Sequence, residues 1–377
     1  MTIKDIQAYS LATPTPQPFS FSQWEYRAKT NTVVKVTTDS GLVGWGECYG
    51  PSKPVAAAVN GFYRERLIGR DPLGNERVWQ FMWQQSLDFA RKGVMMAAMS
   101  GIDLALWDIK GKAVNLPVRT LLGGSSDPVP CYATGMYFRP GLAEEAMIAS
   151  LLREAASYFE AGYGMIKIKI GKTLGFDRRL IVAMRQAFPD SRLAADANHA
   201  YNYKEAVMIG KRLEDHAFEW FEEPLSPEHL ADFALLRAQL RIPIAAGECE
   251  QTRFGFRALA EARALDIMQP DLAYCGGLTE FQKINGIAAA YGVTVIPHCW
   301  GLLINQAAAA SALSMIADNP GRLEPAPLLL EHDRTEHPIR DAIFTLKHEV
   351  RNGVLHFNSA PGLGVDIDPT AMTRFHT

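Results

Sequence analysis

The sequence lacks the features that mark several large classes of protein. It contains no run of basic residues, and its formal net charge is −3 from 38 basic and 41 acidic side chains. A nucleic-acid-binding surface or a polybasic membrane patch therefore has no support, because both need concentrated positive charge. The longest apolar region, residues 94–109, is interrupted by Asp103 and Asp108, so the sequence predicts no transmembrane span.

Cysteine is scarce, and two common motifs are missing. The five cysteines form no CxxC pair and are odd in number, which argues against a disulfide framework and favours reduced thiols. The first residues carry no apolar stretch of signal-peptide type. No GxGxxG-type turn follows a predicted strand, which weakens a doubly wound dinucleotide-binding fold. We expect a cytoplasmic globular protein without nucleic-acid or membrane partners.

The first part of the chain mixes strands and helices. Segments 32–38 and 42–48 are β-rich and flank a turn, as the arms of a hairpin would. Residues 13–24, rich in proline and aromatic side chains, predict an irregular loop long enough to act as a lid. Residues 94–108 are apolar on nearly every side, which is typical of a buried helix.

After residue 125 a regular alternation begins. Short apolar runs alternate with helical segments at spacings of roughly 25 to 35 residues, which indicates a parallel (β/α)8 barrel. The runs are 129–134, 166–170, 193–196, 220–222, 244–248, 267–271, 293–298 and 328–331. With 48% hydrophobic residues among 377, the chain can bury one large domain and a smaller one.

The second run alternates isoleucine with lysine. Successive side chains of a strand point to opposite faces, so Lys167 and Lys169 share one face and the isoleucines share the other. An edge strand that uses lysines against aggregation is one interpretation. A functional site with nearby negative charge is the other.

Polar residues end most of the runs, and the active site of such a barrel lies at these strand ends. The set consists of Lys167, Lys169, Asp196, Glu222, Glu248, Asp271, His298 and Glu331. Each has an ordinary explanation alone, such as a helix cap for Asp196 or a core histidine for His298. Three carboxylates on consecutive strands would repel one another unless a divalent cation bound them. Their oxygens suit Mg²⁺, with Mn²⁺ as an alternative.

The set also predicts a reaction class. Mg²⁺ at Asp196, Glu222 and Glu248 can bind a substrate carboxylate and neutralise an enediolate. Lys169 and His298 can exchange protons from opposite faces, with Asp271 orienting His298. We expect Lys167 and the metal to lower the pKa of Lys169 towards the working range, and Glu331 to contact the substrate. Cys249 and Cys299 follow Glu248 and His298 directly, so continuing strands would turn them away from the mouth, and no thiolate zinc site is expected.

These residues stand in motifs that resemble the enolase superfamily, and within it the mandelate racemase subgroup. The motifs are Gly44-Trp45-Gly46-Glu47, Lys167-Ile168-Lys169, Asp196-Ala197-Asn198, Phe221-Glu222-Glu223-Pro224, Gly247-Glu248, Gln269-Pro270-Asp271, Pro297-His298 and Pro361-Gly362-Leu363-Gly364. The resemblance implies an α+β capping domain at 1–125, closed by 335–377, and a catalytic barrel at 126–334. It also implies metal ligation by the three carboxylates and acid/base roles for Lys169 and the His298–Asp271 pair. The muconate-lactonising subgroup has a lysine on the sixth strand instead, and this chain has none there.

Within the subgroup, the chain is similar to cycloisomerases and dehydratases of sugar acids and their lactones. The resemblance implies abstraction of an α-proton followed by β-elimination on a small-molecule carboxylate. A racemase or epimerase of a 2-hydroxy or amino acid derivative is an alternative, and a non-catalytic barrel used for binding is another. Ala/Met-rich capping helices are compatible with a homo-oligomer. The candidates for substrate contact are Asn198, Trp24, Tyr49, Lys53, His199 and Trp300.

Overall fold

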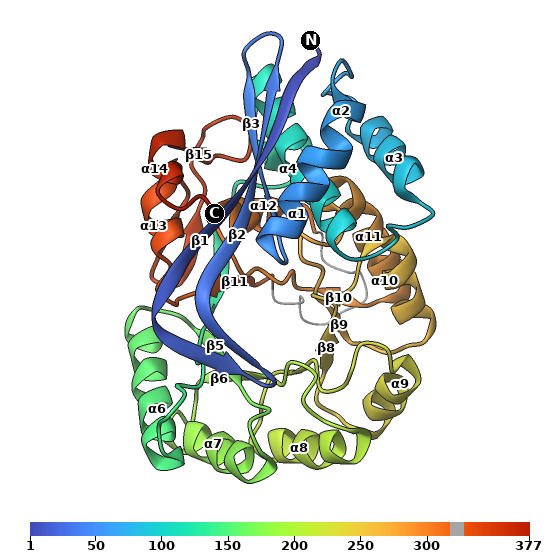
Figure 1. Ribbon diagram of the computed structural model, residues 1–377. Helices are drawn as coiled ribbons and strands as arrows, with labels where there is room; N and C mark the ends of the chain where they lie inside the picture. The colour runs from blue at the N-terminus through green and yellow to red at the C-terminus, as the bar shows by residue number, and fades with distance from the viewer. Residues whose placement is uncertain (317–327) are drawn as a thin grey trace.

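The N-terminal layer combines a three-stranded antiparallel sheet with a group of helices (Figure 1). The computed structural model describes residues 1–316 and 328–377, so part of the predicted barrel range 126–334 lies outside the described residues. The elements of this layer are β1 (Ile3–Phe21), β2 (Trp24–Thr38), β3 (Val43–Cys48), α1 (Ser52–Ala58), the π-helix η1 (Val59–Tyr63), α2 (Arg64–Leu67), α3 (Asn75–Ser86), α4 (Val94–Val114) and α5 (Val118–Leu121).

The predicted hairpin and buried helix are confirmed. β2 pairs antiparallel with β3, and the long helix α4 packs directly against β3. Small residues allow this close approach, because a Cβ on Gly46 would collide with the backbone oxygen of Gly101 on α4. Within the described part of the chain, no helix has both the length and the apolar character that a membrane span requires.

The prediction of an irregular loop at residues 13–24 is wrong. β1 and β2 continue their pairing through this segment, to Phe21 opposite Trp24, with one register shift between Pro14 and Phe19. β1 is an edge strand, where prolines are tolerated because their missing N–H groups interrupt no inner ladder. The hairpin still reaches from the N-terminal layer to the barrel, in the position expected of a lid (Figure 1).

Among the described residues, eight parallel strands in the order β11-β4-β5-β6-β7-β8-β9-β10 form the barrel, in which the eighth strand returns to pair with the first. This confirms the predicted (β/α)8 fold. Helices alternate with the strands: β4 (Val129–Thr134), α6 (Glu144–Glu160), β5 (Met165–Lys169), α7 (Leu174–Ala187), β6 (Arg192–Asp196), α8 (Tyr203–Asp215), β7 (Phe221–Glu222), α9 (Leu230–Gln239), β8 (Ile244–Ala246), α10 (Thr252–Glu261), β9 (Ile267–Met268), α11 (Gly277–Tyr291), β10 (Thr294–Val295), α12 (Leu303–Ser314) and β11 (Leu330–Asp333).

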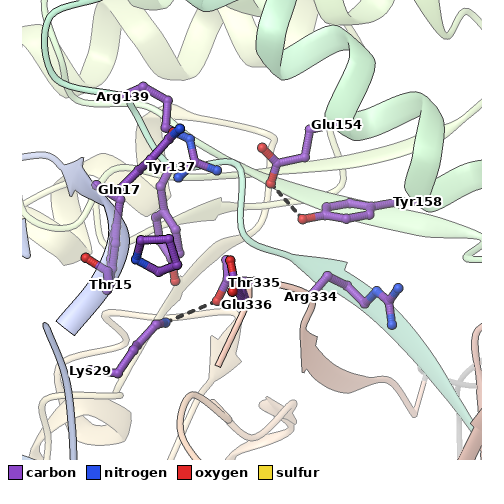
Figure 2. A pocket seen from close by; sticks show the side chains of 12 residues that line it. Thr15, Gln17, Lys29, Tyr137, Arg139, Glu154, Tyr158, Arg334, Thr335 and Glu336 are labelled. Carbon is purple, nitrogen blue, oxygen red and sulfur yellow. Dashed lines mark hydrogen bonds between the residues drawn. The ribbon is translucent and has the colours of Figure 1, made fainter. Parts of the chain in front are cut away.

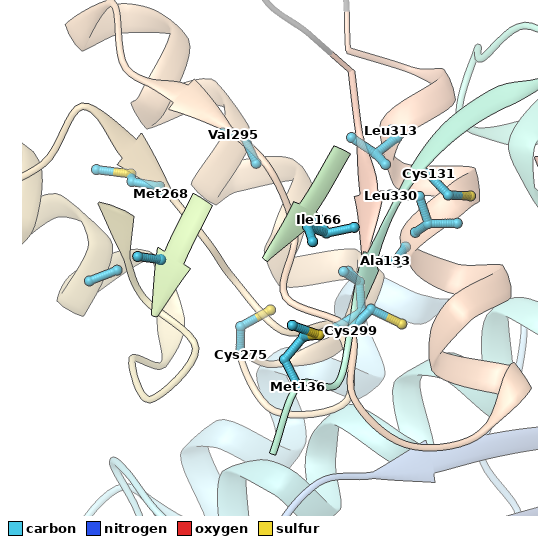
Figure 3. Close-up of a cluster of buried hydrophobic side chains, with 14 of the residues drawn as sticks. Cys131, Ala133, Met136, Ile166, Met268, Cys275, Val295, Cys299, Leu313 and Leu330 are labelled. Carbon is cyan, nitrogen blue, oxygen red and sulfur yellow. The ribbon is translucent and has the colours of Figure 1, made fainter. Parts of the chain in front are cut away.

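The two faces of β5 lie in different surroundings. Ile166 and Ile168 join the large core between strands and helices, part of which Figure 3 shows around Ile166. Met165 belongs to a separate cluster with Tyr132, Trp220 and other side chains. Lys167 and Lys169 follow Met165 at every second position, so they continue its face. β5 pairs with both β4 and β6, so the edge-strand interpretation is wrong.

The C-terminal segment connects both domains, through α13 (Pro338–Ile343), β12 (Phe344–Leu346), β13 (Glu349–Arg351), β14 (Val354–His356), β15 (Asp366–Ile367) and α14 (Pro369–Thr373). β13 and β14 form a short hairpin, and β14 also pairs antiparallel with the barrel strand β4. Further on, the Leu363 N–H donates to Asp108 of α4 at 2.8 Å. The exact domain boundaries stay a prediction.

Candidate active site at the carboxyl ends of the barrel strands

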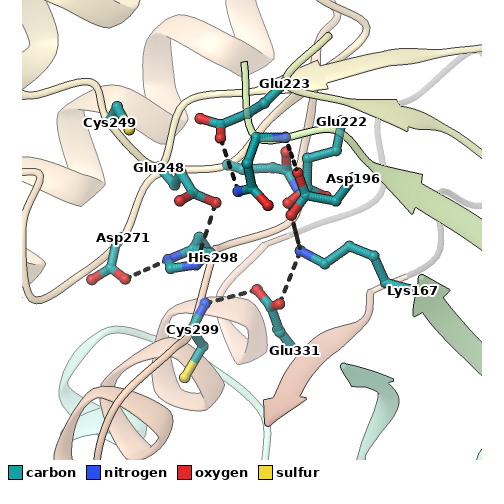
Figure 4. A network of polar contacts seen from close by, with 12 residues as sticks. Lys167, Asp196, Glu222, Glu223, Glu248, Cys249, Asp271, His298, Cys299 and Glu331 are labelled. Atoms are coloured by element: carbon teal, nitrogen blue, oxygen red, sulfur yellow. Dashed lines mark hydrogen bonds and ion pairs between the residues drawn. The ribbon is translucent and has the colours of Figure 1, made fainter. Parts of the chain in front are cut away.

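The eight polar residues predicted for the strand ends are all buried, and they form one contact network at the barrel mouth. Figure 4 labels all of them except Lys169. Lys167 and Lys169 come from β5, Asp196 from β6 and Glu222 from β7. The other four are Glu248 just beyond β8, Asp271 beyond β9, His298 beyond β10 and Glu331 within β11. The strands that carry Glu248, Asp271 and His298 are shorter than expected, so loops hold these three side chains.

Asp196, Glu222 and Glu248 offer a compact set of oxygen ligands. One carboxylate oxygen of each lies within 4.8 Å of those of the other two. Glu248 Oε2 is buried without a hydrogen bond and lies 3.4 Å from His298 Nε2. A hard divalent cation such as Mg²⁺ fits this donor set, because it prefers carboxylate oxygens and would satisfy the unpaired one.

The electrostatics of the cluster show an excess of negative charge. Burial and the neighbouring Asp196, Glu331 and Glu248 outweigh Lys167 and raise the pKa of Glu222 to about 7. The pKa of Asp196 falls to about 2, because the two lysines outweigh the effect of its burial. Asp196 is thus stabilised as an anion and Glu222 is not. Added positive charge would stabilise the anionic form of Glu222 as well.

The two lysines occupy different positions in this network. Lys167 Nζ lies 2.5 Å from Glu222 and 2.9 Å from Glu331. Lys169 Nζ lies 2.5 Å from Asp196 Oδ2 and 3.1 Å from Asn198 Oδ1. Burial alone would lower both pKa values, but the carboxylates outweigh it and raise them. The protein groups alone therefore do not lower the pKa of either lysine, and the lowering expected with a bound metal stays a prediction.

His298 forms a pair with Asp271 on the other side of the carboxylates. Its Nδ1 lies 2.6 Å from Asp271 Oδ2. Asn305 Nδ2 donates to both oxygens of Asp271, at 3.1 and 3.3 Å, and so fixes that carboxylate. Burial alone would lower the pKa of His298, but Glu248, Glu331 and Asp271 raise it to about 10. This imidazole is held as a cation and can donate a proton.

Three supporting residues were not predicted. Trp220 Nε1 and Gln269 Nε2 both donate to Glu222 Oε2, at 2.9 and 2.7 Å, and Asn305 holds Asp271. Gln269 stands in a motif noted in the sequence, two residues before Asp271. Trp220 lies two residues before Glu222 in the same predicted run, so strand alternation could have placed both on one face. Asn305 carries no local signal, since only the fold brings it to Asp271.

Three of the substrate-contact candidates line one cavity of about 540 Å³ beside the network: Trp24, Tyr49 and Trp300. The Tyr49 ring lies 5.9 Å from the ring of His298. Asn198 contacts Lys169 directly, and His199 follows it. Lys53 is exposed on α1, and no contact recorded among the described residues joins it to the mouth.

The tip of the β1–β2 hairpin lies over Lys169. The Phe21 ring lies 5.1 Å from Lys169 Nζ and 5.5 Å from the Tyr137 ring. A second cavity, of about 480 Å³, lies between the hairpin and the loops after β4 and β11 (Figure 2). In it, the buried Lys29 donates to Thr335 at 3.1 Å and lies 4.7 Å from the Trp300 ring. Lys29 thus ties the hairpin to the barrel.

Comparison with known proteins gives consistent matches along the chain. Residues 5–123 match the family described as mandelate racemase / muconate lactonizing enzyme, N-terminal domain, and residues 150–371 match the enolase C-terminal domain-like family. The chain is 39% identical over 377 residues to D-galactarolactone cycloisomerase of Agrobacterium fabrum, which covers 100% of this chain and 99% of that protein.

Solved structures agree with this. The 3,6-anhydro-D-galactonate cycloisomerase from Zobellia galactanivorans matches with a TM-score of 0.90 and 38% identity, over 100% of both chains. A mutant L-talarate/galactarate dehydratase liganded with Mg and L-glucarate matches with a TM-score of 0.86 and 26% identity, over 100% of this chain and 92% of that one.

Proposed function

The chain belongs to the mandelate racemase / muconate lactonizing enzyme family of the enolase superfamily, and we propose that it is a Mg²⁺-dependent lyase or isomerase of a sugar acid or its lactone. In this proposal it removes the proton α to a carboxylate, and β-elimination follows. One observation carries the proposal. Lys169 reaches the cluster of three carboxylates from the side of Asp196, and the His298–Asp271 pair reaches it from the side of Glu248.

The relatives support the substrate class. Their names specify galactarolactone, 3,6-anhydro-D-galactonate, and talarate or galactarate, which are all sugar acids or derivatives of them. The mouth of this chain is polar and aromatic, as binding of a polyhydroxy compound requires. The particular sugar acid depends on the side chains of the hairpin and the strand ends, which differ among relatives of one fold.

Asp196, Glu222 and Glu248 would hold the cation. When bound there, Mg²⁺ supplies positive charge that offsets the carboxylates and the charge that develops on the substrate. Lys169 is the proposed base, and it must first lose the proton that its ion pair with Asp196 retains. Lys167 and Glu331 form an ion pair at 2.9 Å and are proposed to orient the substrate carboxylate.

His298 is the proposed acid on the opposite side. Its raised pKa keeps it protonated at neutral pH, and Asp271 fixes Nδ1 so that Nε2 faces the carboxylate cluster. From there it can protonate a leaving oxygen or the carbon that has lost its proton. The first outcome is elimination and the second is epimerisation. Elimination is the proposal because the named relatives are cycloisomerases and a dehydratase.

The cytoplasmic location and the homo-oligomer stay predictions. The Ala/Met-rich helix that suggested an oligomer is already covered within the chain, since Met96, Ala97 and Met99 are fully buried. An oligomer would need a different surface.

The test is a panel of aldarates, aldonates and their lactones, incubated with the Mg²⁺-loaded enzyme in D₂O. We expect at least one compound to exchange its α-proton and to yield an eliminated product, as detected by NMR and mass spectrometry. Exchange with a product of unchanged bonding would identify an epimerase instead. If no compound in the panel exchanged its α-proton, the proposed function would be wrong.

A further inference from the structure

A second group of metal-type ligands lies at the mouth, beyond the three carboxylates. His199, Glu223 and Cys249 follow the same strands β6, β7 and β8 that lead to Asp196, Glu222 and Glu248. One ligand atom of each lies within 4.8 Å of those of the other two. We propose that these three side chains bind a second divalent cation of borderline softness, of which Zn²⁺ is the model. This site is separate from the carboxylate cluster.

The hydrogen bonding of His199 gives the first argument. Its Nδ1 lies 3.1 Å from the backbone oxygen of Leu225, which can only accept, so Nδ1 carries a proton. In the neutral imidazole, Nε2 then has a free lone pair. That lone pair faces Glu223 Oε2 at 3.1 Å and Cys249 Sγ at 3.5 Å. A backbone carbonyl that fixes the tautomer in this way is typical of metal-binding histidines.

The spacing of the three ligand atoms gives the second argument. In a tetrahedral zinc site with bonds of about 2.0–2.3 Å, nitrogen and oxygen ligands lie about 3.3 Å apart, and nitrogen and sulfur ligands about 3.6 Å apart. The measured separations from His199 Nε2 are 3.1 Å to Glu223 Oε2 and 3.5 Å to Cys249 Sγ. The three side chains therefore need only small movements to share one cation. Water or a ligand oxygen would complete the coordination.

The donor types separate this site from the first. Nitrogen, oxygen and sulfur together favour Zn²⁺ over Mg²⁺, whereas three carboxylates favour Mg²⁺. Asn198 lies between the two groups, because its Nδ2 donates to Glu223 at 3.4 Å and its Oδ1 accepts from Lys169. The expectation that Cys249 faces away from the mouth is wrong. β8 ends at Ala246, and Gly247 has a φ of +132°, so the strand alternation does not continue to Cys249.

The competing explanation is that His199, Glu223 and Cys249 are held together by a proton shared between Glu223 and His199, without a metal ion. Burial raises the pKa of Glu223 well above its ordinary value, so a protonated Glu223 could donate to His199 Nε2. Burial and nearby carboxylates also raise the pKa of the Cys249 thiol, and a bound cation would have to displace its proton. The two explanations differ in what Zn²⁺ does to Cys249.

Alkylation of native protein tests the proposal without relying on turnover. Of the five cysteines only Cys249 is exposed, so a small thiol reagent should modify it first. With Mg²⁺ in excess throughout, we expect micromolar Zn²⁺ to slow this modification at least about tenfold, as followed by intact mass and peptide mapping. An unchanged rate at saturating Zn²⁺ would overturn the site.

Metal titration of variants provides the second measurement, on tag-free protein that holds Mg²⁺. Wild-type protein should bind Co²⁺ with a thiolate-to-metal absorption band, and Cys249→Ser should lose the band. His199→Ala should weaken Zn²⁺ binding at least about tenfold in calorimetry. Cys131→Ala, which alters a buried cysteine elsewhere in the barrel (Figure 3), is the matched control and should keep both signals. A band that persists in Cys249→Ser, or equal Zn²⁺ affinity in all three variants, contradicts the proposal.

Failure of this site is distinguishable from failure of the proposed function. Glu222→Gln alters the carboxylate cluster and should reduce turnover of any sugar acid, yet it leaves His199, Glu223 and Cys249 unchanged. The Co²⁺ absorption band should therefore persist in Glu222→Gln. Loss of the band in this variant would show that Cys249 binds Co²⁺ only when the carboxylate cluster is intact, which contradicts a separate site.

Discussion

Two lysines only two residues apart have different surroundings, and this difference indicates which of them exchanges protons. Lys167 is fully enclosed and lies within 3.8 Å of oxygens of three carboxylates, those of Glu222, Glu331 and Asp196. Lys169 keeps a little exposure and lies under the Phe21 ring of the hairpin. Lys169 is thus the more accessible of the two from the mouth, which favours it as the residue that exchanges a proton with the substrate.

Lys169→Ala should therefore lower turnover by roughly 10²–10⁴-fold, the usual contribution of a positioned acid or base. α-Proton exchange in D₂O should fall in parallel, while circular dichroism stays that of the wild type. Lys172→Ala, which removes an exposed lysine just beyond the same strand, should keep full turnover. Normal turnover in Lys169→Ala would remove this residue from the reaction.

Asp196→Asn tests the carboxylate cluster. The substitution keeps the size of the side chain and removes one of the three charges that a cation would neutralise, so Mg²⁺ binding should weaken by at least about tenfold in calorimetry. The exposed Asp190→Asn is the control of equal charge change. Equal Mg²⁺ affinity in the two variants would show that Asp196 is not a ligand.

The strand pattern allowed all eight network residues to be located from the sequence, because each one lies within or ends a recognisable apolar run. The supporting residues escaped, because their roles depend on three-dimensional neighbours. Glu47 illustrates this. It stands in a noted motif of the N-terminal layer, yet its carboxylate accepts from the N–H groups of Leu302 and Asn305, about 255 residues away.

At the level of elements, the contact between β3 and α4 decides how closely the N-terminal layer packs. Gly46 and Gly101 face each other there, and neither has space for a side chain. The same contact places Glu47 against α12 and brings the hairpin strands over the barrel. The strand and helix of this contact were both predicted from periodicity, but their mutual distance could not be.

Gly46→Ala should destabilise the protein by about 3 kcal/mol, because the added methyl group must displace helix backbone and not a flexible side chain. Gly61→Ala in η1 is the matched control, since nothing lies within 4 Å of its Cβ position. It should be neutral or stabilise the protein by about 0.5–1 kcal/mol. Equal thermal midpoints for both variants would contradict the close contact.

The hairpin shows where sequence patterns failed at this level. Three prolines and the aromatic residues that follow them read as a loop, since proline usually interrupts a strand. The chain tolerates them because β1 is an edge strand and the register shift after Pro14 absorbs the extra residues. The strands β8, β9 and β10 were also predicted too long, because loop residues at barrel ends can be as apolar as the strands they follow.

Across the whole molecule, buried neutral histidines in the C-terminal segment make stability depend on pH. His348 Nε2 lies 3.0 Å from the backbone oxygen of Leu363, and its Nδ1 accepts from the N–H of Asn358 at 3.2 Å. A second proton on the ring would break the latter bond. Burial accordingly lowers the pKa of His348 to about 4, and it lowers that of His337 to about 3.

The sign of the effect follows from the lowered pKa. Between pH 6.5 and 4 the unfolded chain binds more protons at His348 than the folded chain does, so the stabilising contribution is complete above pH 6.5 and is lost as the pH falls towards 4. The loss from this residue is at most roughly 3 kcal/mol.

His348→Gln should therefore reduce the drop in unfolding free energy between pH 7 and pH 4.5, because an amide can make both hydrogen bonds without titrating. Urea unfolding at the two pH values measures the difference. The exposed His229→Gln should keep the full wild-type drop. An identical drop in all three proteins would mean that His348 titrates normally in the folded state.

The pairing of the C-terminal segment with the N-terminal layer has a consequence for synthesis on the ribosome. Ser10 and Thr377 are 367 residues apart and lie in contact, and Trp45 Nε1 donates to Asp366 at 2.8 Å. The first sheet to leave the ribosome therefore lacks these contacts until residues encoded hundreds of codons later have been translated. Until then its apolar face is exposed, and chaperones can bind it. A permuted gene that encodes residues 336–377 first would shorten that delay.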